Sequence, residues 1–600
     1  MCGLVAVMSY TGQSIDRAEL LDIRDAMASR GPDGAGFWIS ENRRVGLGHR
    51  RLALVDLSDA GGQPMVSRDG LLRIVFNGEI YNYRELREYL EKRGCVFRSS
   101  SDTEVLLNLY AEIGEEMVER LRGMYAFVIW DEKRQHLFAA RDPFGIKPLY
   151  YAEDSRQIRF ASQVKALLKS RGINTTREPA GQVGFLLWGY VPEPFTLYKS
   201  IVAFPAGTSL TIKSNGHRSL RQFCSISEEL SRLEGKEPSA DSDPIAVVRD
   251  SIADSVGAHL LADVPVAVFL SAGLDSAVIA GLATEEPTGK IISITLGFEE
   301  FRDTENDETA QAEVLAKHFR TDHHVQWYSR NDFETDLEKI MNAMDQPSID
   351  GINTYLVSKA AHSYGIKAAL SGVGGDELFG SYPSFRDVPR MTRLLCGRSL
   401  TSFGSAFRTL SSPLFDYLAA PKYAGLIQFG GTYAGAYILR RGLFMPWDMS
   451  RVIPAEIVSE GWARLAPLDR LEETIGNIES PRMKVSALEI SWYMRNQLLR
   501  DSDWAGMANS IEIRTPMVDL DVLRSIGPVV HALPKNGKQF LKNIPRNMIP
   551  ESVAKRRKTG FAVPIHDWLS GAASVGLSRN LSSGLRNWAT RLVKEFDLIG

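Results

Sequence analysis

The stretch PVAVFLSAGLDS, residues 265–276, decides how the middle of this chain is interpreted. Residues 266–270 form a short apolar run between a proline and a turn of small residues, a pattern that predicts a buried strand. Residues 271–273 supply a tight loop, and Asp275 and Ser276 open an apolar run that predicts a helix. A strand that turns through small residues into a helix presents free backbone N–H groups and the positive end of a helix dipole. The segment is therefore a candidate anion site.

A second stretch, LSGVGGDELFG at 370–380, repeats this design further along the chain. A candidate strand at 367–370 is followed by a glycine-rich turn and an acidic pair. Asp275 in the first loop and Asp376 in the second carry oxygen ligands of the kind that hold Mg²⁺ against phosphate. The two loops therefore predict a site that binds pyrophosphate and its Mg²⁺ from both sides. The sequence has no GxxxxGK[ST] motif, which argues against a P-loop kinase or GTPase.

Length and composition narrow the class of protein. The 600 residues are too many for one core and predict two or more domains. The formal net charge of −3 gives no reason to expect nucleic acid or an anionic membrane as a partner. The four cysteines lack CxxC spacing, which argues against a disulfide framework and favours a cytoplasmic location. The most apolar stretch, 423–439, contains several glycines, so we predict a buried helix there and no membrane span.

The first third of the chain, to about residue 216, has the pattern of one unit. Short apolar runs, often alternating with polar residues and separated by Gly, Asp or Pro, predict antiparallel sheets. Two stretches with helical spacing, 83–92 and 102–113, complete a layered α+β domain. We expect its chemistry at Cys2. Removal of the initiator methionine would leave this thiol beside a free α-amino group that can act as its base.

Four further segments follow Cys2 in a fixed order. They are SRGPD at 29–33, HRRLALVD at 49–56, FNGEIYN at 76–82 and SSDTE at 100–104. Each alone is typical of a turn or a helix cap, and we predict that the third ends a strand in an Asn-Gly turn. Together they resemble the class II glutamine amidotransferase domain, which folds as an N-terminal-nucleophile αββα sandwich.

This resemblance implies a glutaminase site. Cys2 would attack the side-chain amide of glutamine, and the Asn77 side chain and Gly78 N–H would form the oxyanion hole. Arg51 matches the family arginine that pairs with the glutamine α-carboxylate, to which a guanidinium is suited. Glu79 and Asp102 match the residues that hold the α-amino group. The implied glutamine-binding positions are Arg51, Leu52, Val55, Asn77, Gly78, Glu79 and Asp102.

After residue 243 helices and strands alternate, which predicts a parallel sheet with ligands at the carboxyl ends of its strands. The SAGLDS loop resembles the SGGxDS loop of the ATP pyrophosphatases. With the rest of the chain, it resembles the glutamine-hydrolysing asparagine synthetase family. The expected organisation is a glutaminase domain at 1–216, a charged linker at 217–243, and an α/β ATP-pyrophosphatase domain at 244–600 with a helical insertion at 383–482.

The same resemblance implies the residues of the second site. Lys538 matches the family lysine that contacts phosphate and supports adenylation, and Asp275 and Asp376 would bind the metal. The cofactors implied are ATP and Mg²⁺. The partners implied are small-molecule substrates, with a homodimer as a candidate assembly. The positions expected to bind ATP or pyrophosphate are Leu270, Ser271, Gly273, Asp275, Ser276, Leu296, Ser371 and Gly372.

The reaction implied is the amidation of aspartate by ammonia, through an acyl-adenylate made with ATP. One departure bears on the acceptor, because family members commonly have SGEG at the second loop and this chain has Val373 in place of the glutamate. Either Glu377 or Glu512 substitutes, or the acceptor is another carboxylate of a secondary-metabolite, peptide or polysaccharide pathway. A non-catalytic glutamine or ATP sensor is disfavoured by the intact motifs.

Ammonia must travel between the two sites. In bulk water at neutral pH it is mostly protonated and is not a nucleophile, so we expect a dry channel. The segment RDPFGIKPLY at 141–150 matches a family stretch near this path, so we expect it at the boundary between the domains.

Overall fold

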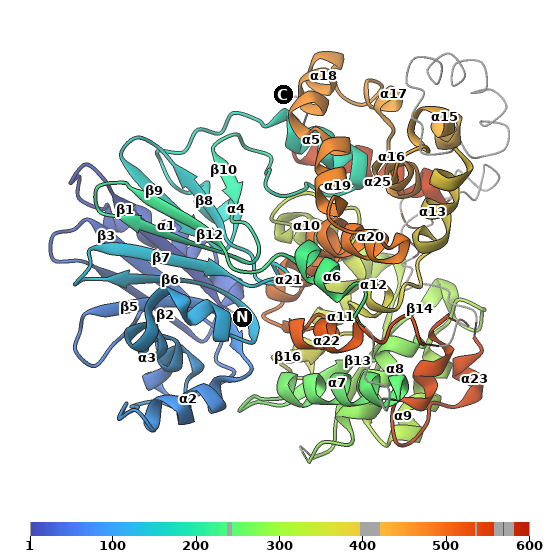
Figure 1. Cartoon of the computed structure of the whole chain (residues 1–600), viewed down its shortest axis with the longest axis horizontal. Helices are drawn as coiled ribbons and strands as arrows, with labels where there is room; N and C mark the ends of the chain where they lie inside the picture. The colour runs from blue at the N-terminus through green and yellow to red at the C-terminus, as the bar shows by residue number, and fades with distance from the viewer. Residues whose placement is uncertain are drawn as a thin grey trace.

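Figure 1 shows the computed structural model, which describes residues 2–236, 243–287, 289–395, 421–533, 537–556, 564, 568 and 581–598. A β-rich N-terminal unit lies on the left of this view, and a larger, mainly helical unit lies on the right. The predicted succession of an α+β unit and an α/β unit is confirmed.

Two six-stranded antiparallel sheets form the N-terminal unit. The first sheet has the order β10-β8-β9-β1-β3-β2, and its strands in sequence are β1 (Gly3–Ser9), β2 (Gly34–Ile39), β3 (Val45–Arg51), β8 (Tyr150–Glu153), β9 (Gln157–Ala161) and β10 (Ile201–Ala203). The second sheet has the order β12-β11-β7-β6-β5-β4, and its strands are β4 (Met65–Val66), β5 (Leu72–Ile80), β6 (Gly123–Asp131), β7 (His136–Arg141), β11 (Thr208–Lys213) and β12 (Arg218–Gln222).

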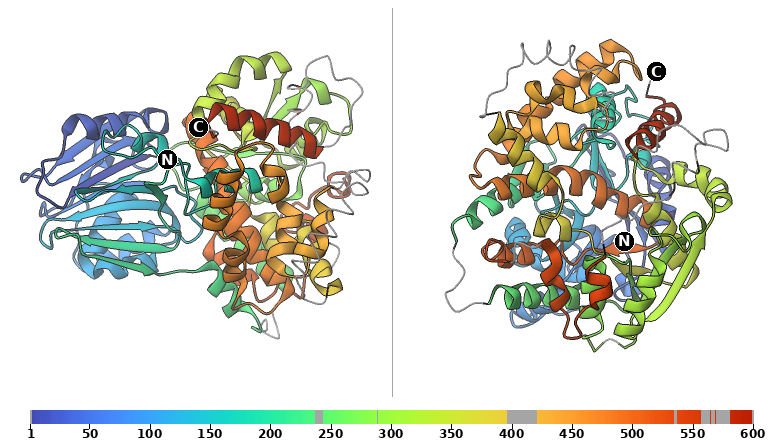
Figure 2. Two further views of the ribbon diagram at one scale, coloured as in Figure 1. Left: turned by 90° about the horizontal axis from the view of Figure 1, so that it is seen from above. Right: turned by 90° about the vertical axis from the view of Figure 1, so that its right-hand side faces the viewer.

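The two sheets pack face to face between helices, as Figure 2 shows from above. Successive side chains of a strand point to opposite faces of its sheet. In β1, Leu4 and Ala6 accordingly pack against Val128 of the second sheet, whereas Val5 and Val7 pack outward. The helices on the outer faces are α1 (Arg17–Asp25) and α4 (Val164–Leu167) on the first sheet, and α2 (Tyr83–Glu91) and α3 (Asp102–Ile113) on the second. This is the predicted αββα sandwich.

The predicted Asn-Gly turn at the end of a strand is wrong. Strand β5 continues through Asn77 and Gly78, which pair with Ala126 and Tyr125 of β6. An Asn-Gly pair favours a turn, but the ladder to β6 holds this one extended. A Cβ at Gly78 would lie 2.1 Å from the carbonyl oxygen of Met124, so glycine is required here by the close approach of β6.

Part of the predicted linker has regular structure. Residues 218–222 form β12, which pairs with β11 and so extends the second sheet. Helix α6 (Ile226–Leu233) follows and buries Leu230 and Leu233. Residues 237–242 lie outside the described residues. The residue boundaries of the two domains stay a prediction.

The larger unit contains the expected parallel sheet. All of its described strand pairs are parallel, and the order is β15-β14-β13-β16-β17. The strands are β13 (Val266–Phe269), β14 (Ile292–Phe298), β15 (Asp322–Tyr328), β16 (Ala368–Leu370) and β17 (Glu512–Arg514). Helix α7 (Pro244–His259) precedes β13, and the helices that follow β13 include α8 (Leu274–Ala283), α9 (Thr309–Phe319), α10 (Arg330–Ala343), α11 (Ile352–Ser363), α12 (Gly375–Phe379) and α13 (Ser384–Leu394).

The predicted helical insertion is confirmed for the part of 383–482 that is described, although 396–420 lie outside it. The predicted single helix at 423–439 is wrong, because α15 and α16 share this stretch. No helix in the described part of the chain is long and apolar enough to cross a membrane. The remaining helices are α5 (Pro179–Trp188), α15 (Leu426–Phe429), α16 (Tyr433–Arg441), α17 (Pro446–Met449), α18 (Ala455–Leu465), α19 (Pro467–Ile475), α20 (Pro481–Leu488), the π-helix η6 (Glu489–Leu499), α21 (Arg500–Ala508), α22 (Leu520–Ile526), α23 (Glu551–Ala554) and α25 (Leu581–Glu595).

Candidate active sites

The first site surrounds Cys2, which is buried at the start of β1. The Cys2 main-chain nitrogen donates to Asn77 Oδ1 at 2.9 Å, and Sγ lies 3.9 Å from the Leu52 carbonyl oxygen. Asn77 Nδ2 is buried and has no hydrogen-bond partner among the described residues. An unused amide donor beside a thiol is what an oxyanion hole requires. The structure thus brings Cys2, Leu52 and Asn77 together.

The thiol of Cys2 requires activation. Burial raises its pKa, because the thiolate loses contact with water. A base within reach must therefore remove the proton. The Cys2 nitrogen, which becomes the α-amino group when Met1 is removed, is the base that the sequence predicts.

The other predicted glutamine-binding residues include two that follow or end β3, Arg51 and Val55, and one at the start of α3, Asp102. Arg51 Nη1 donates to the Ser58 carbonyl oxygen at 2.8 Å and Nη2 donates to that of Asp56, so the guanidinium is bonded to its own loop, which also carries Val55. Asp102 accepts from the Ile80 N–H at 3.0 Å, and its burial raises its pKa to about 6. A carboxylate pairing by Arg51 stays a prediction.

Glu79 is joined to the larger unit. Arg514 Nη2 lies 3.5 Å from Glu79 Oε2, and Arg514 Nε lies 2.7 Å from Glu512 Oε1. Burial would raise the pKa of Glu512, but positive charges that include Arg514 and Lys147 lower it overall, so this carboxylate is ionised. The strand β17 therefore brings a charged pair against the glutaminase site.

A second link between the units, which the sequence analysis missed, runs through Arg30. Its guanidinium is fully buried and donates to the Asp503 carboxylate on α21 at 2.6 and 2.9 Å. The third donor, Nε, bonds the carbonyl oxygen of Cys2 at 3.0 Å. The SRGPD segment alone predicts a turn. It cannot predict the ion pair, because Asp503 is distant in sequence. Arg30 therefore connects the main chain of Cys2 to the larger unit.

Replacing Asp503 by alanine should destabilise the protein by about 3–5 kcal/mol, because Arg30 would remain buried without its counter-charge. Glutaminase activity should fall too, since the carbonyl of Cys2 loses its fixed donor. Urea denaturation and a glutaminase assay measure both effects. The matched control is Lys367→Ala, which removes the more exposed interdomain pair with Asp33 and should cost at most about 1 kcal/mol. Equal losses in the two variants would contradict the role of Arg30.

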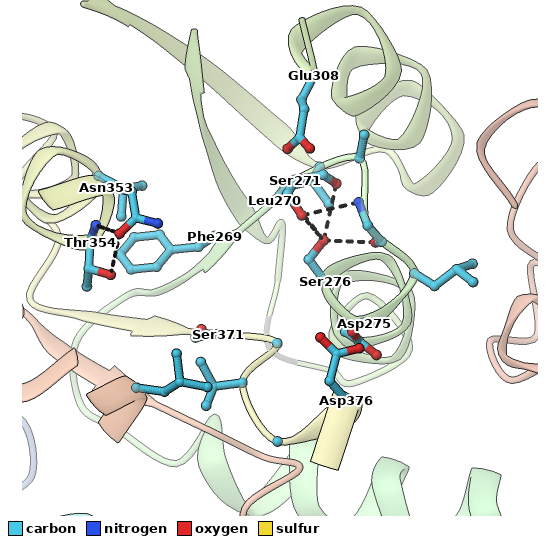
Figure 3. Close-up of a pocket in the computed structure, with 18 of the residues that line it drawn as sticks. Phe269, Leu270, Ser271, Asp275, Ser276, Glu308, Asn353, Thr354, Ser371 and Asp376 are labelled. Atoms are coloured by element: carbon cyan, nitrogen blue, oxygen red, sulfur yellow. Dashed lines mark hydrogen bonds between the residues drawn. The ribbon is translucent and has the colours of Figure 1, made fainter. Parts of the chain in front are cut away.

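The second site is a cavity of about 650 Å³ at the carboxyl ends of the parallel strands. Figure 3 shows the first loop, in which the Ser276 hydroxyl donates to the carbonyl oxygens of Ser271 and Gly273 at 3.1 and 3.0 Å. The hydroxyls of Ser271 and Ser276 lie 2.9 Å apart. The residues that line the cavity include every predicted ATP or metal position, namely Leu270, Ser271, Gly273, Asp275, Ser276, Leu296, Ser371, Gly372, Asp376 and Lys538.

The two loops pack closely against each other. A Cβ at Gly375 would lie 2.3 Å from Asp275 Oδ1, and one at Gly372 would lie 3.0 Å from the Asp275 Cβ, so both glycines permit the approach. As a result the carboxylates of Asp275 and Asp376 point toward each other (Figure 3). Lys538 Nζ contacts both, at 2.7 and 2.6 Å from Asp275 and 2.6 Å from Asp376. Burial alone would lower the pKa of Lys538, but the two carboxylates raise it, so the ammonium is charged.

Comparisons with known proteins agree with this geometry. A glutamine amidotransferase domain model matches residues 1–224, and an asparagine synthase model matches residues 247–594. The glutamine-hydrolysing asparagine synthetase 1 of Bacillus subtilis is 34% identical over 95% of this chain and 88% of its own length. The chain belongs to the asparagine synthase family. It is an enzyme of the glutamine-hydrolysing asparagine synthase type.

Two further relatives are named as an asparagine synthetase and as an amidase. A putative asparagine synthetase of Mycobacterium tuberculosis is 30% identical over 95% of this chain and 88% of its own length. A protein of Gibberella zeae named amidase chry2 is 30% identical over 95% of this chain and 90% of its own. Among solved structures, the glutamine phosphoribosylpyrophosphate amidotransferase of Bacillus subtilis covers 54% of this chain and 65% of that chain, with 17% identity and a TM-score of 0.29.

Several residues that line the second cavity were not predicted from the sequence. Asn353 and Thr354 lie in the first turn of α11, after Gly351, whose φ of 89° places it in the left-handed region. Gly351 was the sequence signal that could have indicated these residues, because a glycine often marks a change of chain direction at the start of a helix. The others that line the cavity without a recognised motif include Phe269, Glu308, Asp350, Tyr382, Tyr493, Gln539 and Arg556.

The two departures from the family motifs have different consequences. Ala272 replaces a glycine, and because its φ is not positive the loop accepts it without strain. Val373 lines the cavity, and its side chain has no polar atom. Of the two carboxylates considered as substitutes, Glu377 lines the cavity, whereas Glu512 does not and pairs with Arg514.

Proposed function

We propose that the chain is a glutamine-dependent, ATP-consuming amide ligase, which converts aspartate, glutamine and ATP into asparagine, glutamate, AMP and pyrophosphate. The observation that carries this proposal is the presence of two assembled sites in one chain. One presents Cys2 beside the free amide donor of Asn77, and the other presents two loops with facing carboxylates. Membership of the asparagine synthase family supports the same reaction.

At the first site the Cys2 thiolate attacks the amide carbon of glutamine. The negative charge that develops on the amide oxygen is stabilised by the unused Nδ2–H of Asn77. The base that took the thiol proton returns it to the amide nitrogen, and collapse of the intermediate then releases ammonia and leaves a glutamyl thioester. Water hydrolyses the thioester to glutamate and frees the thiol of Cys2.

At the second site the acceptor carboxylate attacks the α-phosphate of ATP and displaces pyrophosphate. Asp275 and Asp376 fit Mg²⁺, because two carboxylates and phosphate oxygens are its usual ligands. When bound, Mg²⁺ would neutralise charge on the phosphates. Lys538 would move from the carboxylates toward the phosphate oxygens and stabilise the charge on the leaving pyrophosphate.

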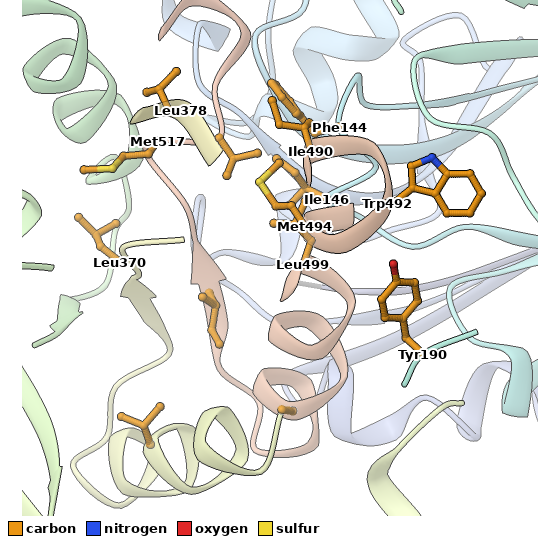
Figure 4. Packing of buried hydrophobic residues seen from close by; sticks show 14 of the residues in the cluster. Phe144, Ile146, Tyr190, Leu370, Leu378, Ile490, Trp492, Met494, Leu499 and Met517 are labelled. Carbon is orange, nitrogen blue, oxygen red and sulfur yellow. The ribbon is translucent and has the colours of Figure 1, made fainter. Parts of the chain in front are cut away.

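An apolar cluster between the sites supports a dry path for ammonia. Figure 4 shows Phe144 and Ile146 of the N-terminal unit near Met494 and Leu499 of the larger unit, all of them buried. Arg495 Nε donates to the Phe144 carbonyl oxygen at 2.9 Å and so fixes this contact. The segment predicted to lie at the domain boundary does lie there.

When glutamine is the nitrogen donor, added ¹⁵N-ammonium should label only a small share of the amide product. Ammonia released at Cys2 would reach the acyl-adenylate through apolar surroundings without mixing with the solvent pool. Mass spectrometry of the product measures the labelled share. Labelling in proportion to the solvent ammonium would rule out a closed path.

A different acceptor carboxylate is the second candidate. Two observations favour it, the apolar Val373 in the cavity and the similarity to a relative named as an amidase. The rest of the machinery would be unchanged, because any carboxylate acceptor needs the same adenylation and the same supply of ammonia.

Exchange of [³²P]pyrophosphate into ATP tests the proposal and separates the two acceptors. The purified protein is assayed with Mg²⁺, with and without aspartate, and then with other carboxylates. Exchange that depends on aspartate supports asparagine synthesis. Exchange that depends on another carboxylate supports the second candidate. The absence of exchange with every carboxylate would overturn the proposed ligase activity.

A further inference from the structure

Side chains of both units meet at the end of β5 that carries the first site. Glu79 lies two residues after Asn77 on this strand, so the two side chains project from the same face. Tyr81, which directly follows β5, packs against His259 of α7 with ring centroids 3.9 Å apart. Arg514 reaches the same region from β17 and is fully buried. The surroundings of Glu79 are therefore built by both units.

The guanidinium of Arg514 is fixed by bonds within its own unit. Its Nε donates to Glu512 Oε1 at 2.7 Å. Its Nη1 donates to the carbonyl oxygens of His259 and Leu261, each at 2.7 Å. Its Nη2 makes no hydrogen bond in the described part of the chain and lies 3.5 Å from Glu79 Oε2. Three bonds that Glu79 does not supply thus hold a positive charge against Glu79.

The carboxylate of Glu79 depends on this charge. Burial raises the pKa of Glu79 and the negative charge of Glu512 raises it further, whereas Arg514 lowers it. Asp102 also raises this pKa, and the amino terminus lowers it. A protonated carboxyl group has no charge with which to pair with an ammonium ion. Loss of Arg514 would therefore weaken the residue that is predicted to hold the α-amino group of glutamine.

We propose that Arg514 is a positioning residue for glutamine, which holds the Glu79 carboxylate in its charged form and directed toward the α-ammonium group of the substrate. This inference rests on the proposed glutaminase step and on the predicted role of Glu79 in it. Arg514 acts through Glu79 and touches no reacting atom. The larger unit, which consumes the ammonia, thereby also takes part in the selection of its donor.

Glutaramate, which is glutamine without its α-ammonium group, provides the test. The ratio of its inhibition constant to the KM of glutamine, both measured in the glutaminase assay, reports how much the ammonium group contributes to binding. Arg514→Gln removes the charge and keeps an amide that can donate to the carbonyl oxygens. This ratio should fall at least about tenfold, because an opposite charge beside a carboxylate shifts its ionisation equilibrium by about 10–10³-fold. The KM of glutamine should rise while kcat changes less.

Two matched variants separate the charge of Arg514 from its packing. Arg514→Lys loses the same guanidinium but retains a positive charge, so it should recover part of the ratio. Glu512→Gln removes the negative charge that opposes the ionisation of Glu79 and should leave the ratio unchanged or raise it. Because it is nearly isosteric, this variant also tests the proposal if the Arg514 variants do not fold. The control is Arg524→Gln, which removes an arginine bonded to Glu229 at 2.9 Å and should not change the ratio.

Pyrophosphate exchange shows whether β17 keeps its place in each variant. The Arg514 carbonyl oxygen accepts from the N–H of Ser371 in the second loop at 2.8 Å, so a displaced strand would lower the exchange rate. An unchanged ratio in Arg514→Gln, equal ratios in the Gln and Lys variants, or a lower ratio in Glu512→Gln would overturn the role of Arg514. A wild-type enzyme that binds glutaramate as tightly as glutamine would overturn it too. No glutaminase activity in the wild type would overturn the proposed first step, and this inference with it.

Discussion

Replacing Cys2 by alanine should abolish glutamine-dependent amide formation and leave ammonia-dependent formation unchanged. The thiol of Cys2 is placed for covalent attack at the first site, with Sγ near the Leu52 carbonyl oxygen and the Asn77 amide alongside. The loss should be on the order of 10⁶-fold in kcat, the scale seen when a hydrolase loses its nucleophile. Glutamate release and product formation, measured with glutamine and then with ammonium chloride, give the two rates.

The control for this experiment is Cys95→Ala. Cys95 is half-buried next to the cluster around α2 and α3 and is not one of the predicted site residues, so its loss should leave both rates unchanged. If Cys2→Ala retained glutaminase activity, another nucleophile would have to operate and the first site would be wrongly placed. If it also lost ammonia-dependent synthesis, the change would have disturbed the interface that Arg30 holds.

Much of the fold follows from short-range pattern. The apolar run before the SAGLDS loop became β13, and the run after it became α8, because a proline and small residues mark both ends. The predicted helix at 102–113 matches α3, where Ser101 caps the first turn. The prediction of a turn at Asn77–Gly78 was wrong because it considered local sequence alone. The conformation of these residues is decided by pairing with β6, a contact distant in sequence.

The candidate sites divide in the same way. Residues in glycine-rich or serine-rich loops, such as Ser271 and Gly372, could be predicted, because their motifs reflect local geometry around a ligand. Residues that complete the sites from distant segments could not. Asp503 meets Arg30 only through the packing of two domains, and no spacing rule connects them. Sequence therefore predicts the loops better than the contacts between the units.

The interface also explains why the two activities belong in one protein. Arg514 on β17 lies close to Glu79 of the N-terminal unit. Arg30 bonds both the Cys2 carbonyl oxygen and the Asp503 carboxylate on α21. Asp501, on that same helix, lines the nucleotide cavity. Helix α21 and the bonds of Arg30 therefore connect the main chain of Cys2 with the wall of the second cavity.

Replacing Lys538 by methionine should abolish pyrophosphate exchange while glutaminase activity persists. In the structure the Lys538 ammonium neutralises Asp275 and Asp376 at 2.6–2.7 Å. Methionine keeps the length of the side chain and removes the charge that would stabilise departing pyrophosphate. Loss of one such electrostatic donor should lower the exchange rate by about 10²–10³-fold.

The same variant should respond to Mg²⁺ in a way that does not depend on catalysis. Without the ammonium, the two facing carboxylates lose the positive charge that they share, so thermal stability should fall. Added Mg²⁺ should restore more stability to Lys538→Met than to the wild type, because binding to the folded state alone raises stability by mass action. The control is Lys542→Met on the same 3₁₀ turn η7 (Gly537–Asn543), where the lysine pairs with Glu551 at the surface. Full exchange by Lys538→Met, or an equal Mg²⁺ response in both proteins, would contradict the placement of the metal and phosphate at these loops.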